Sequence, residues 1–428
     1  MKKTIKAENV INKRLLRQKL VKRRGGQLFC NMGSFWKPTT SEETGAYIRS
    51  RLPEDEAVEI STNVMREVIN RIRQLEQFEL PDDVLAPDCM MNFMNGILDL
   101  ETGSFQTDRE KTPVFLYCND CFYHEDATLE QAPSFKQFCE TSLDGDEKKR
   151  KLLLQIFGYC ISGLQAVKAG FFFIGEANSG KSLMLELVQR VVGDAQVTNI
   201  PFDKLGSRFN KARLALSRVN ICTELAGGKM KDIDFFKTIT AHERVTADNK
   251  GETPFEFRVR TKLLTAGNVM PAIPETTGAE AILNRMIILR FNRAIPQEEM
   301  DKELLDKLLE EIDVIFSLAA KELMQLMKNG YRFSEPADSL EYKAIIKSSL
   351  ISVDEFLREE CEFVPESREY LKTLWGSYLD FCDNNGYEVK MSTLQFSQKL
   401  LEYPELERKK FRINGDKPLW GFQGLRIK

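Results

Sequence analysis

An eight-residue glycine-rich segment constrains the fold of this 428-residue chain more than any other feature. Residues 175–182 read GEANSGKS and fit the pattern G-x-x-x-x-G-K-[ST] without a mismatch. An apolar run, residues 171–174, precedes the segment, and an amphipathic stretch, residues 183–192, follows it. Because a strand, a glycine turn and a helix in this order surround a phosphate with backbone N–H groups, the segment predicts a nucleoside triphosphate site.

The residues of this loop are of types that bind phosphate and Mg²⁺. Glycines let the backbone N–H groups turn inward, and the helix N-terminus favours negative charge. Lys181 is expected to reach the β- and γ-phosphates, and the Ser182 hydroxyl is expected to hold Mg²⁺. The predicted nucleotide contacts are Gly175, Glu176, Ala177, Asn178, Ser179, Gly180, Lys181 and Ser182.

Two polar residues end apolar runs further along the chain. Glu224 ends the run 218–224, where a carboxylate can orient the attacking water and lie beside the Mg²⁺ held by Ser182. Thr223 stands where a second carboxylate would be expected. Asn268 ends the run 261–268, and its amide can bond both the γ-phosphate and the attacking water. Taken singly, each residue could also be an ordinary solvated surface group.

Two further features predict contacts outside the loop. Arg285 opens the last apolar run, and an arginine at a strand edge can reach into a neighbouring subunit as an arginine finger. Residues 243–258 alternate around Asn249-Lys250-Gly251 and predict a β-hairpin with Lys250 near its tip. Such a hairpin can grip single-stranded DNA through Arg244, Asn249 and Lys250, although a solvated surface hairpin has the same pattern.

Short apolar runs predict the fold class. Residues 170–174, 219–222, 263–266 and 286–289 lack polar alternation, which is typical of strands buried on both faces of an α/β sheet. The C-terminal part predicts three helices and a hairpin, an order that suggests a winged helix. We expect a basic arm (1–35), a mixed α+β module (36–148), an ATPase core with helices on both faces of the sheet (149–300), a helical linker or lid (301–349) and a winged-helix domain (350–428).

The charge is polarised although the net charge is only -3. Residues 1–24 hold ten Lys/Arg and one acid, and residues 405–428 hold seven Lys/Arg and three acids, so both ends are either phosphate contacts or solvated tails. No apolar run approaches the roughly 18 residues that span a bilayer, and we expect a cytoplasmic protein without a membrane partner. The nine cysteines favour reduced thiols. Cys118 and Cys121, followed by His124, form one CxxC pair, but no second CxxC or HxxxH follows to complete the four ligands of a zinc site, and structural thiols are the expected interpretation.

The order of the motifs resembles that of superfamily 3 helicases of the phage, plasmid and poxvirus primase-helicase type. The resemblance covers about residues 80–428 and includes NGILDLETG before the loop, RVNICTE, TADNKGETPFEF, LLTAGN and LNRMIILRF in the core, and STLQFSQKL near the end. It implies an AAA+ core that binds ATP between subunits of a ring, usually a hexamer, and moves 3′ to 5′ on single-stranded DNA. It also implies that Lys181 and Ser182 bind ATP and Mg²⁺, Glu224 is the acidic motif, Lys250 is the hairpin lysine, Asn268 is the sensor and Arg285 is the finger.

The leading hypothesis is an ATP-driven DNA helicase that acts on single-stranded and forked DNA in the replication of a mobile genetic element, phage or virus. Only about 40 N-terminal residues are spare, too few for a primase domain, so a separate primase or origin-recognition partner is expected. The alternative is an ATP-dependent origin-binding initiator or helicase loader with little unwinding. A small-molecule kinase is a third hypothesis, but it explains neither the basic hairpin nor the winged helix.

Overall fold

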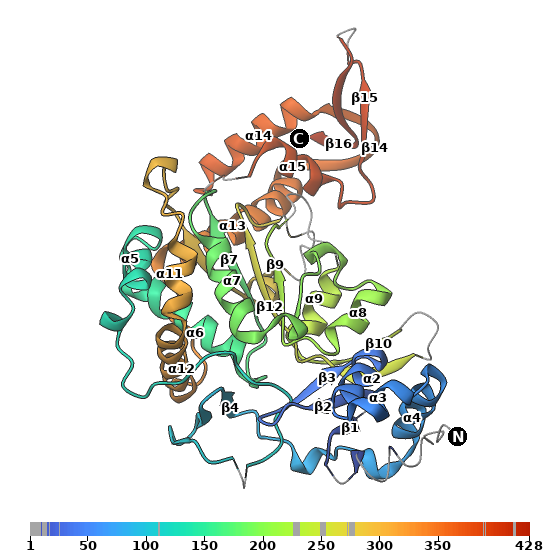
Figure 1. The fold of residues 1–428 in the computed structure, drawn as a ribbon. Coiled ribbons are helices and arrows are strands. Elements are labelled where there is room, and N and C mark those ends of the chain that lie inside the picture. The colour runs from blue at the N-terminus through green and yellow to red at the C-terminus, as the bar shows by residue number, and fades with distance from the viewer. Residues whose placement is uncertain are drawn as a thin grey trace.

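A parallel five-stranded sheet forms the centre of the computed structural model (Figure 1). The structure describes residues 10, 15–16, 18–24, 26–109, 112–225, 232–248, 254–271, 273, 279–387, 389, 391–413 and 417–428. The strand order is β13-β7-β12-β9-β8, and the strands are β7 (Gly170–Gly175), β8 (Val197–Thr198), β9 (Val219–Cys222), β12 (Lys262–Gly267) and β13 (Met286–Phe291). The expected α/β core is confirmed, and all of its strand pairs are parallel.

Helices cover both faces of this sheet, which explains why its strands lack polar alternation. Phe171 and Phe173 of β7 face one apolar cluster, and Phe172 and Ile174 face another. The first face is covered by α6 (Glu147–Ile161), α7 (Lys181–Val192), α11 (Leu304–Glu310) and α12 (Ile312–Lys328). The second face is covered by α8 (Arg208–Leu214), α9 (Ile233–Thr240) and α10 (Ala279–Leu283).

The N-terminal part contains two small antiparallel sheets. The first consists of β1 (Val21–Arg24), β2 (Gln27–Asn31) and β3 (Trp36–Thr39), and it packs with α2 (Ser41–Ser50) and α4 (Thr62–Gln74), which the short helix α3 (Glu54–Glu59) separates in the chain. The second consists of β4 (Met90–Phe93), β5 (Gly96–Asp99) and β6 (Phe105–Gln106). Helix α5 (Pro133–Ser142) and the 3₁₀ turns η2 (Glu76–Phe78), η3 (Asp82–Val84) and η4 (Leu129–Gln131) complete this part.

The sequence predicts a basic arm over residues 1–35, but residues 21–24 and 27–31 form the strands β1 and β2. Arg24 pairs with Gln27 across the turn between β1 and β2, and Gly26 there has a φ of 82°. Strands β1 and β2 therefore form a β-hairpin rather than an arm. Val21 and Leu28 are buried in the cluster that α4 also lines, so this stretch is folded because its apolar residues reach a core.

The C-terminal part is a small α/β unit. It consists of α13 (Ala337–Glu360), β14 (Cys361–Tyr370), α14 (Leu371–Asn384), α15 (Thr393–Leu400), β15 (Glu407–Phe411) and β16 (Leu419–Ile427), with the sheet order β14-β16-β15. Helix α14 begins at Leu371, because β14 pairs with β16 up to Tyr370. Helix α13 runs unbroken across the boundary expected at residues 349 and 350.

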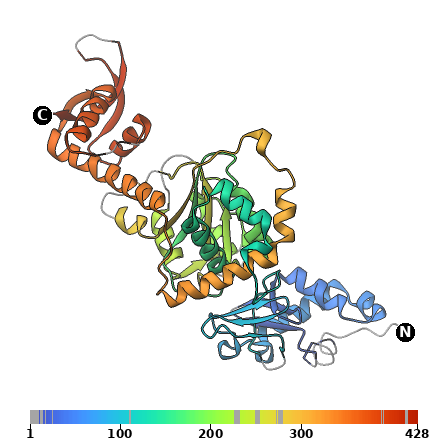
Figure 2. The same ribbon diagram turned by 90° about the vertical axis from the view of Figure 1, so that its left-hand side faces the viewer.

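The N-terminal and C-terminal parts lie at opposite ends of the core (Figure 2). The remaining elements are the hairpin strands β10 (Arg244–Ala247) and β11 (Phe255–Arg258) and the 3₁₀ turns η5 (Asp194–Gln196), η6 (Phe202–Lys204) and η7 (Gln297–Glu299). Across the part of the chain that the structure describes, no helix combines the length and the apolar character needed to cross a membrane.

The close packing of α6 on α12 makes a testable prediction. A Cβ at Gly158 of α6 would lie 2.3 Å from the Ala319 carbonyl oxygen of α12, so Gly158→Ala forces the helices apart. We expect it to lower the free energy of unfolding by about 1–3 kcal/mol, measured by urea denaturation.

Gly376 of α14 provides the matched control, since a Cβ there has no neighbouring heavy atom within 4 Å. Gly376→Ala should leave stability unchanged or raise it by up to about 1 kcal/mol, because alanine favours a helix. Equal urea midpoints for wild type and Gly158→Ala would contradict the packing described here.

Candidate functional site

The glycine-rich loop joins β7 to α7 and has a backbone that only glycine can supply at two positions. A Cβ at Gly175 would lie 1.8 Å from the Phe291 carbonyl oxygen. Gly180, the residue before α7, has a φ of 87°, and a Cβ there would lie 2.5 Å from Cε2 of Phe138. Asn178 has a φ of 57°, in the left-handed region. At positions 175 and 180, therefore, steric contacts allow no residue other than glycine.

Hydrogen bonds fasten this loop to the segment that follows β13. The Glu176 amide donates to the Phe291 carbonyl oxygen at 3.1 Å, and the Ile295 amide donates to the Asn178 carbonyl oxygen at 3.1 Å. Ala177 lies between these anchors and is exposed. The loop is thus held in place from the neighbouring strand.

Lys181 lies inside the loop rather than in solvent. Its side chain is buried, and its Nζ donates to the Gly175 carbonyl oxygen at 2.9 Å, to Ser179 Oγ at 3.0 Å and to the Glu176 carbonyl oxygen. Burial lowers the pKa of Lys181, and the charge of Glu176 partly offsets this. Because all three hydrogen-bond acceptors are neutral, the ammonium has no hydrogen-bonded carboxylate and can bind a phosphate. Ser182 is exposed in the first turn of α7.

Glu224 and Asn268 lie at the same edge of the sheet as the loop. Gly267, the last residue of β12, pairs with Ile174 of β7, and Thr265 pairs with Cys222, the last residue of β9. The Leu225 amide donates to the Ala266 carbonyl oxygen at 2.9 Å, which holds the segment after β9 against β12. Glu224 and Asn268 are both exposed there. The carboxyl edge of the sheet therefore brings together Lys181, Ser182, Glu224 and Asn268.

Arg285 lies at the opposite edge of the sheet. It precedes β13, and its carbonyl oxygen accepts from the amide of Gly170, the first residue of β7. Its Nη1 donates to the Ala281 carbonyl oxygen at 3.0 Å, and its buried Nε has no partner within the described ranges. Within one chain Arg285 does not join the residues of the loop.

The predicted hairpin is present as β10 and β11, and it places two arginines face to face. Arg244 and Arg258 are directly opposed in the antiparallel register, and both are exposed. Asn249 and Lys250 lie outside the described residues. Arg258 is a candidate that the sequence analysis missed, although the alternation of residues 255–258 places it on the same face as Arg244.

The cysteine pair near the start of the core consists of buried thiols. Burial raises the pKa of both Cys118 and Cys121, which favours the protonated thiol over the thiolate that binds metal. Within the described ranges, no three His, Cys, Asp or Glu side chains cluster closely enough to hold a metal ion. Ser182 and Glu224 remain the candidate Mg²⁺ ligands.

Comparisons with known proteins give a partial match to a helicase. A family of unknown function (DUF5906) matches residues 173–285, which include the loop, Glu224 and Asn268. The chain is 22% identical over 191 residues to a protein of Acanthamoeba polyphaga mimivirus named "Putative helicase L207/L206". That match covers 43% of this chain and 20% of the mimivirus protein, so the chain matches about a fifth of its relative.

Two solved structures of the C-terminal region of NrS-1, both without ligand, match over most of their length. One is 13% identical, covers 96% of this chain and 97% of its own, and has a TM-score of 0.47. The other is 12% identical with the same coverage and a TM-score of 0.46.

Proposed function

We propose that this chain is an ATP-dependent DNA helicase of superfamily 3 that unwinds DNA during replication of a virus, phage or other mobile genetic element. The arrangement of the carboxyl edge carries the proposal, since Lys181, Ser182, Glu224 and Asn268 meet there from three neighbouring strands. The partial match to a viral protein named as a helicase supports the nucleic-acid substrate. A 3′ to 5′ direction follows from the motif resemblance and belongs to the proposal.

Each residue of the edge has a role in hydrolysis of ATP under this proposal. The loop amides and Lys181 hold the phosphates, and Ser182 with Glu224 would hold Mg²⁺, which supplies positive charge to the β- and γ-phosphate oxygens. Glu224 accepts a proton from the attacking water, and the Asn268 amide orients that water against the γ-phosphate. Exposure of Glu224 and Asn268 leaves both side chains accessible to a nucleotide.

A ring of identical subunits, proposed as a hexamer, completes the site. Arg285 lies across the sheet from its own loop, so it can act only on a nucleotide held by another subunit. This position suits an arginine finger that is supplied by a neighbour. The AAA+ assignment of the core belongs to the same proposal, together with the five-part domain organisation.

Two basic surfaces are proposed to contact DNA. The first is the hairpin, where Arg244 and Arg258 oppose each other without an ion-pair partner among the described residues. Like charges directly opposite in a sheet are destabilising, and bound phosphates would offset this cost. The second is on β15 and β16, where the guanidinium of Arg408 lies 4.9 Å and the Nζ of Lys410 5.1 Å from the centre of the Trp420 ring.

The second surface also favours the alternative function, an origin-binding initiator or helicase loader. Trp420 is 48% exposed although it is a large aromatic side chain, and two cations flank it on a hairpin of a proposed winged helix. An aromatic ring between cations suits contact with nucleic acid. Unwinding of a forked substrate that carries no origin sequence separates the helicase from this alternative.

The hydrolysis of ATP with and without single-stranded DNA tests the proposed function. DNA should stimulate hydrolysis by wild type, and Lys250→Ala should abolish the stimulation while basal hydrolysis survives, because Lys250 is the proposed grip on the strand. A phosphate-release assay measures the hydrolysis rate of each protein with and without DNA. If DNA changes neither rate, the chain is not a translocating helicase.

Glu224→Gln tests the proposed role of the carboxylate. It should lower the ATP hydrolysis rate by about 10²–10⁴-fold, because an amide cannot accept the proton of the attacking water. Nucleotide affinity, measured with a fluorescent ATP analogue, should change little. Glu303→Gln, at an exposed glutamate of 79% side-chain exposure beside α11, is the control and should hydrolyse ATP at the wild-type rate. An unchanged rate in Glu224→Gln would rule out this role.

Replacing one of the two opposed arginines of the hairpin should weaken DNA binding and at the same time raise the stability of the fold. Arg258→Gln should weaken DNA binding and reduce the slope of log affinity against log salt by about 0.7 for each lost single-strand phosphate contact. It should also stabilise the fold by up to about 1 kcal/mol, because it removes a like-charge pair. Arg190→Gln, on an exposed arginine of α7, should leave the salt dependence unchanged. Loss of stability without loss of DNA affinity would show a purely structural role.

A further inference from the structure

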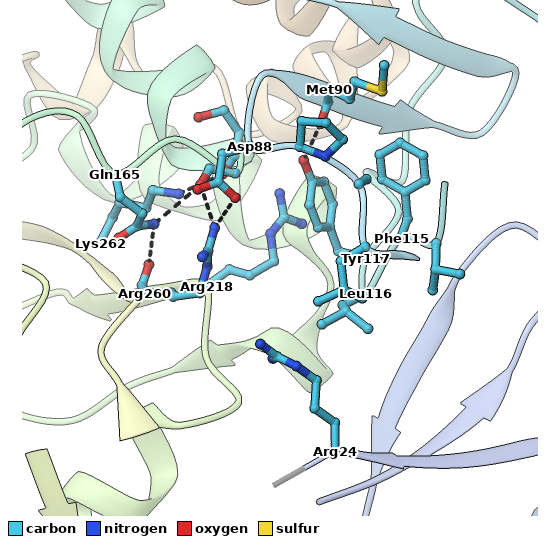
Figure 3. A pocket seen from close by; sticks show the side chains of 16 residues that line it. Arg24, Asp88, Met90, Phe115, Leu116, Tyr117, Gln165, Arg218, Arg260 and Lys262 are labelled. Carbon is cyan, nitrogen blue, oxygen red and sulfur yellow. Dashed lines mark hydrogen bonds and ion pairs between the residues drawn. The ribbon is translucent and has the colours of Figure 1, made fainter. Parts of the chain in front are cut away.

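A small pocket opens at the amino edge of the central sheet, away from the proposed nucleotide site. Its volume is about 120 Å³. Residues 85–88, 90 and 114–117 of the N-terminal part line it together with core residues at the starts of β9 and β12 (Figure 3). The cationic lining residues are Arg24, Arg218, Arg260 and Lys262.

The positive charge in this pocket greatly exceeds the negative charge. Arg218 is 9% exposed and Lys262 is 3% exposed, so both cations are almost withdrawn from water. Among the described residues that line the pocket, the sole carboxylate is Asp88, and it forms an ion pair with Arg260. Arg218 and Lys262 therefore have no carboxylate partner in the lining.

The contacts of Arg218 leave two of its nitrogens unused. Its Nη2 donates to Asn119 Oδ1 at 2.8 Å and to the Ile161 carbonyl oxygen, while Nε and Nη1 are buried without a hydrogen-bond acceptor among the residues that the structure describes. The guanidinium carbon lies 3.8 Å from the centre of the Tyr117 ring, and Figure 3 shows the side chain extending across the pocket toward that ring. An unpaired buried N–H group is costly, so a further acceptor would be stabilising.

The end of α6 offsets only part of this charge. Lys262 Nζ donates to the Ser162 carbonyl oxygen at 2.6 Å, and Ile161, which accepts from Arg218, is the last residue of that helix. A helix C-terminus carries about half a negative charge, whereas two cations are buried beside it. More than one unit of positive charge is left without compensation when both groups are protonated.

We propose that this pocket binds a tetrahedral oxyanion, a phosphate group, between Arg218, Lys262 and Arg260. The volume suits a small anion, because pockets that enclose drug-sized ligands measure about 300–1,000 Å³. The anion supplies the missing negative charge beside the two buried cations. The site differs from the glycine-rich loop, which lies at the other edge of the sheet, so the proposal does not depend on the proposed function.

Protonation of Lys262 controls the charge of the pocket. Burial lowers the pKa of Lys262 to about 7, with a further lowering by Arg218. Below that pH the lysine is charged and adds to the attraction for an anion; above it this contribution is lost, and that of Arg218, whose pKa is lowered only to about 10, remains. The groups that act on Lys262 or lie beside it are Arg218, Arg260, Cys160, Asp88, His242 and the ring of Tyr159.

Sulfate is the first probe, because its charge does not change between pH 6 and 8.5 and every pH effect then belongs to the protein. Isothermal titration calorimetry of the full chain uses a Lys181→Ala background, which weakens anion binding at the loop, and chloride keeps the ionic strength constant. We expect saturable binding of one sulfate that weakens roughly tenfold from pH 6 to 8.5, the effect of one charge-assisted hydrogen bond. No saturable binding at pH 6 would overturn the proposal.

Variants of the pocket locate the bound sulfate. Lys262→Met should remove the pH dependence, and Arg260→Gln, at the 49% exposed side chain, should weaken binding several-fold without disturbing the buried groups. Arg293→Gln is the matched control, since its side chain is 48% exposed and also forms an ion pair. Circular dichroism checks that each variant folds. Unchanged affinity and pH dependence in both pocket variants would overturn the proposal.

Two further titrations at pH 6 distinguish free phosphate from the phosphate group of a nucleotide. Inorganic phosphate that competes with sulfate, while adenosine 5′-monophosphate does not, identifies free phosphate as the ligand. Competition by adenosine 5′-monophosphate that Arg260→Gln weakens identifies the phosphate of a nucleotide. Failure of both to compete with bound sulfate would overturn the assignment to phosphate.

Discussion

The contact between Gly175 and the Phe291 carbonyl oxygen is the constraint on which the rest of the site depends. A Cβ at position 175 would lie 1.8 Å from that oxygen, so β7 and the end of β13 approach as closely as glycine allows. The Glu176 amide uses the same oxygen as its acceptor. One carbonyl group therefore sets both the spacing of the two strands and the start of the loop. The position of Lys181 in the loop follows from it.

The strand order then decides which side chains meet. β12 lies between β7 and β9 although it comes later in the chain, so residues after three strands share one edge. At the other edge of the sheet, where β9 and β12 begin, the polar groups are cations. Arg218 and Lys262 stand at the starts of β9 and β12, while Glu224 and Asn268 follow their ends. A parallel sheet thus separates an edge with the exposed carboxylate of Glu224 from an edge with buried cations.

Local patterns predicted the core well and the long-range contacts poorly. The apolar runs at 219–222 and 286–289 are strands because burial on both faces leaves a direct trace in the sequence. The pairing of β14 with β16 leaves a weaker trace, since only one of the ten residues of β14 is buried. The pocket residues Asp88, Arg218 and Lys262 lie far apart in the chain, and only the fold brings them together. Arg258 differs from these residues, because the alternation within the predicted hairpin already placed it on the face of Arg244.

The buried cations at the amino edge also join the N-terminal part to the core. Arg218 contacts Tyr117 and Asn119 of the N-terminal part and Ile161 of α6, so one side chain bridges the two parts. Because the pKa of Lys262 is lowered from 10.5 to about 7, the unfolded chain binds more protons than the folded chain between these values. This group therefore makes stability rise with pH across that range, and below pH 7 its burial as a cation is a full cost. An anion in the pocket would reduce that cost where it is largest, and it would strengthen the same junction that Arg218 forms.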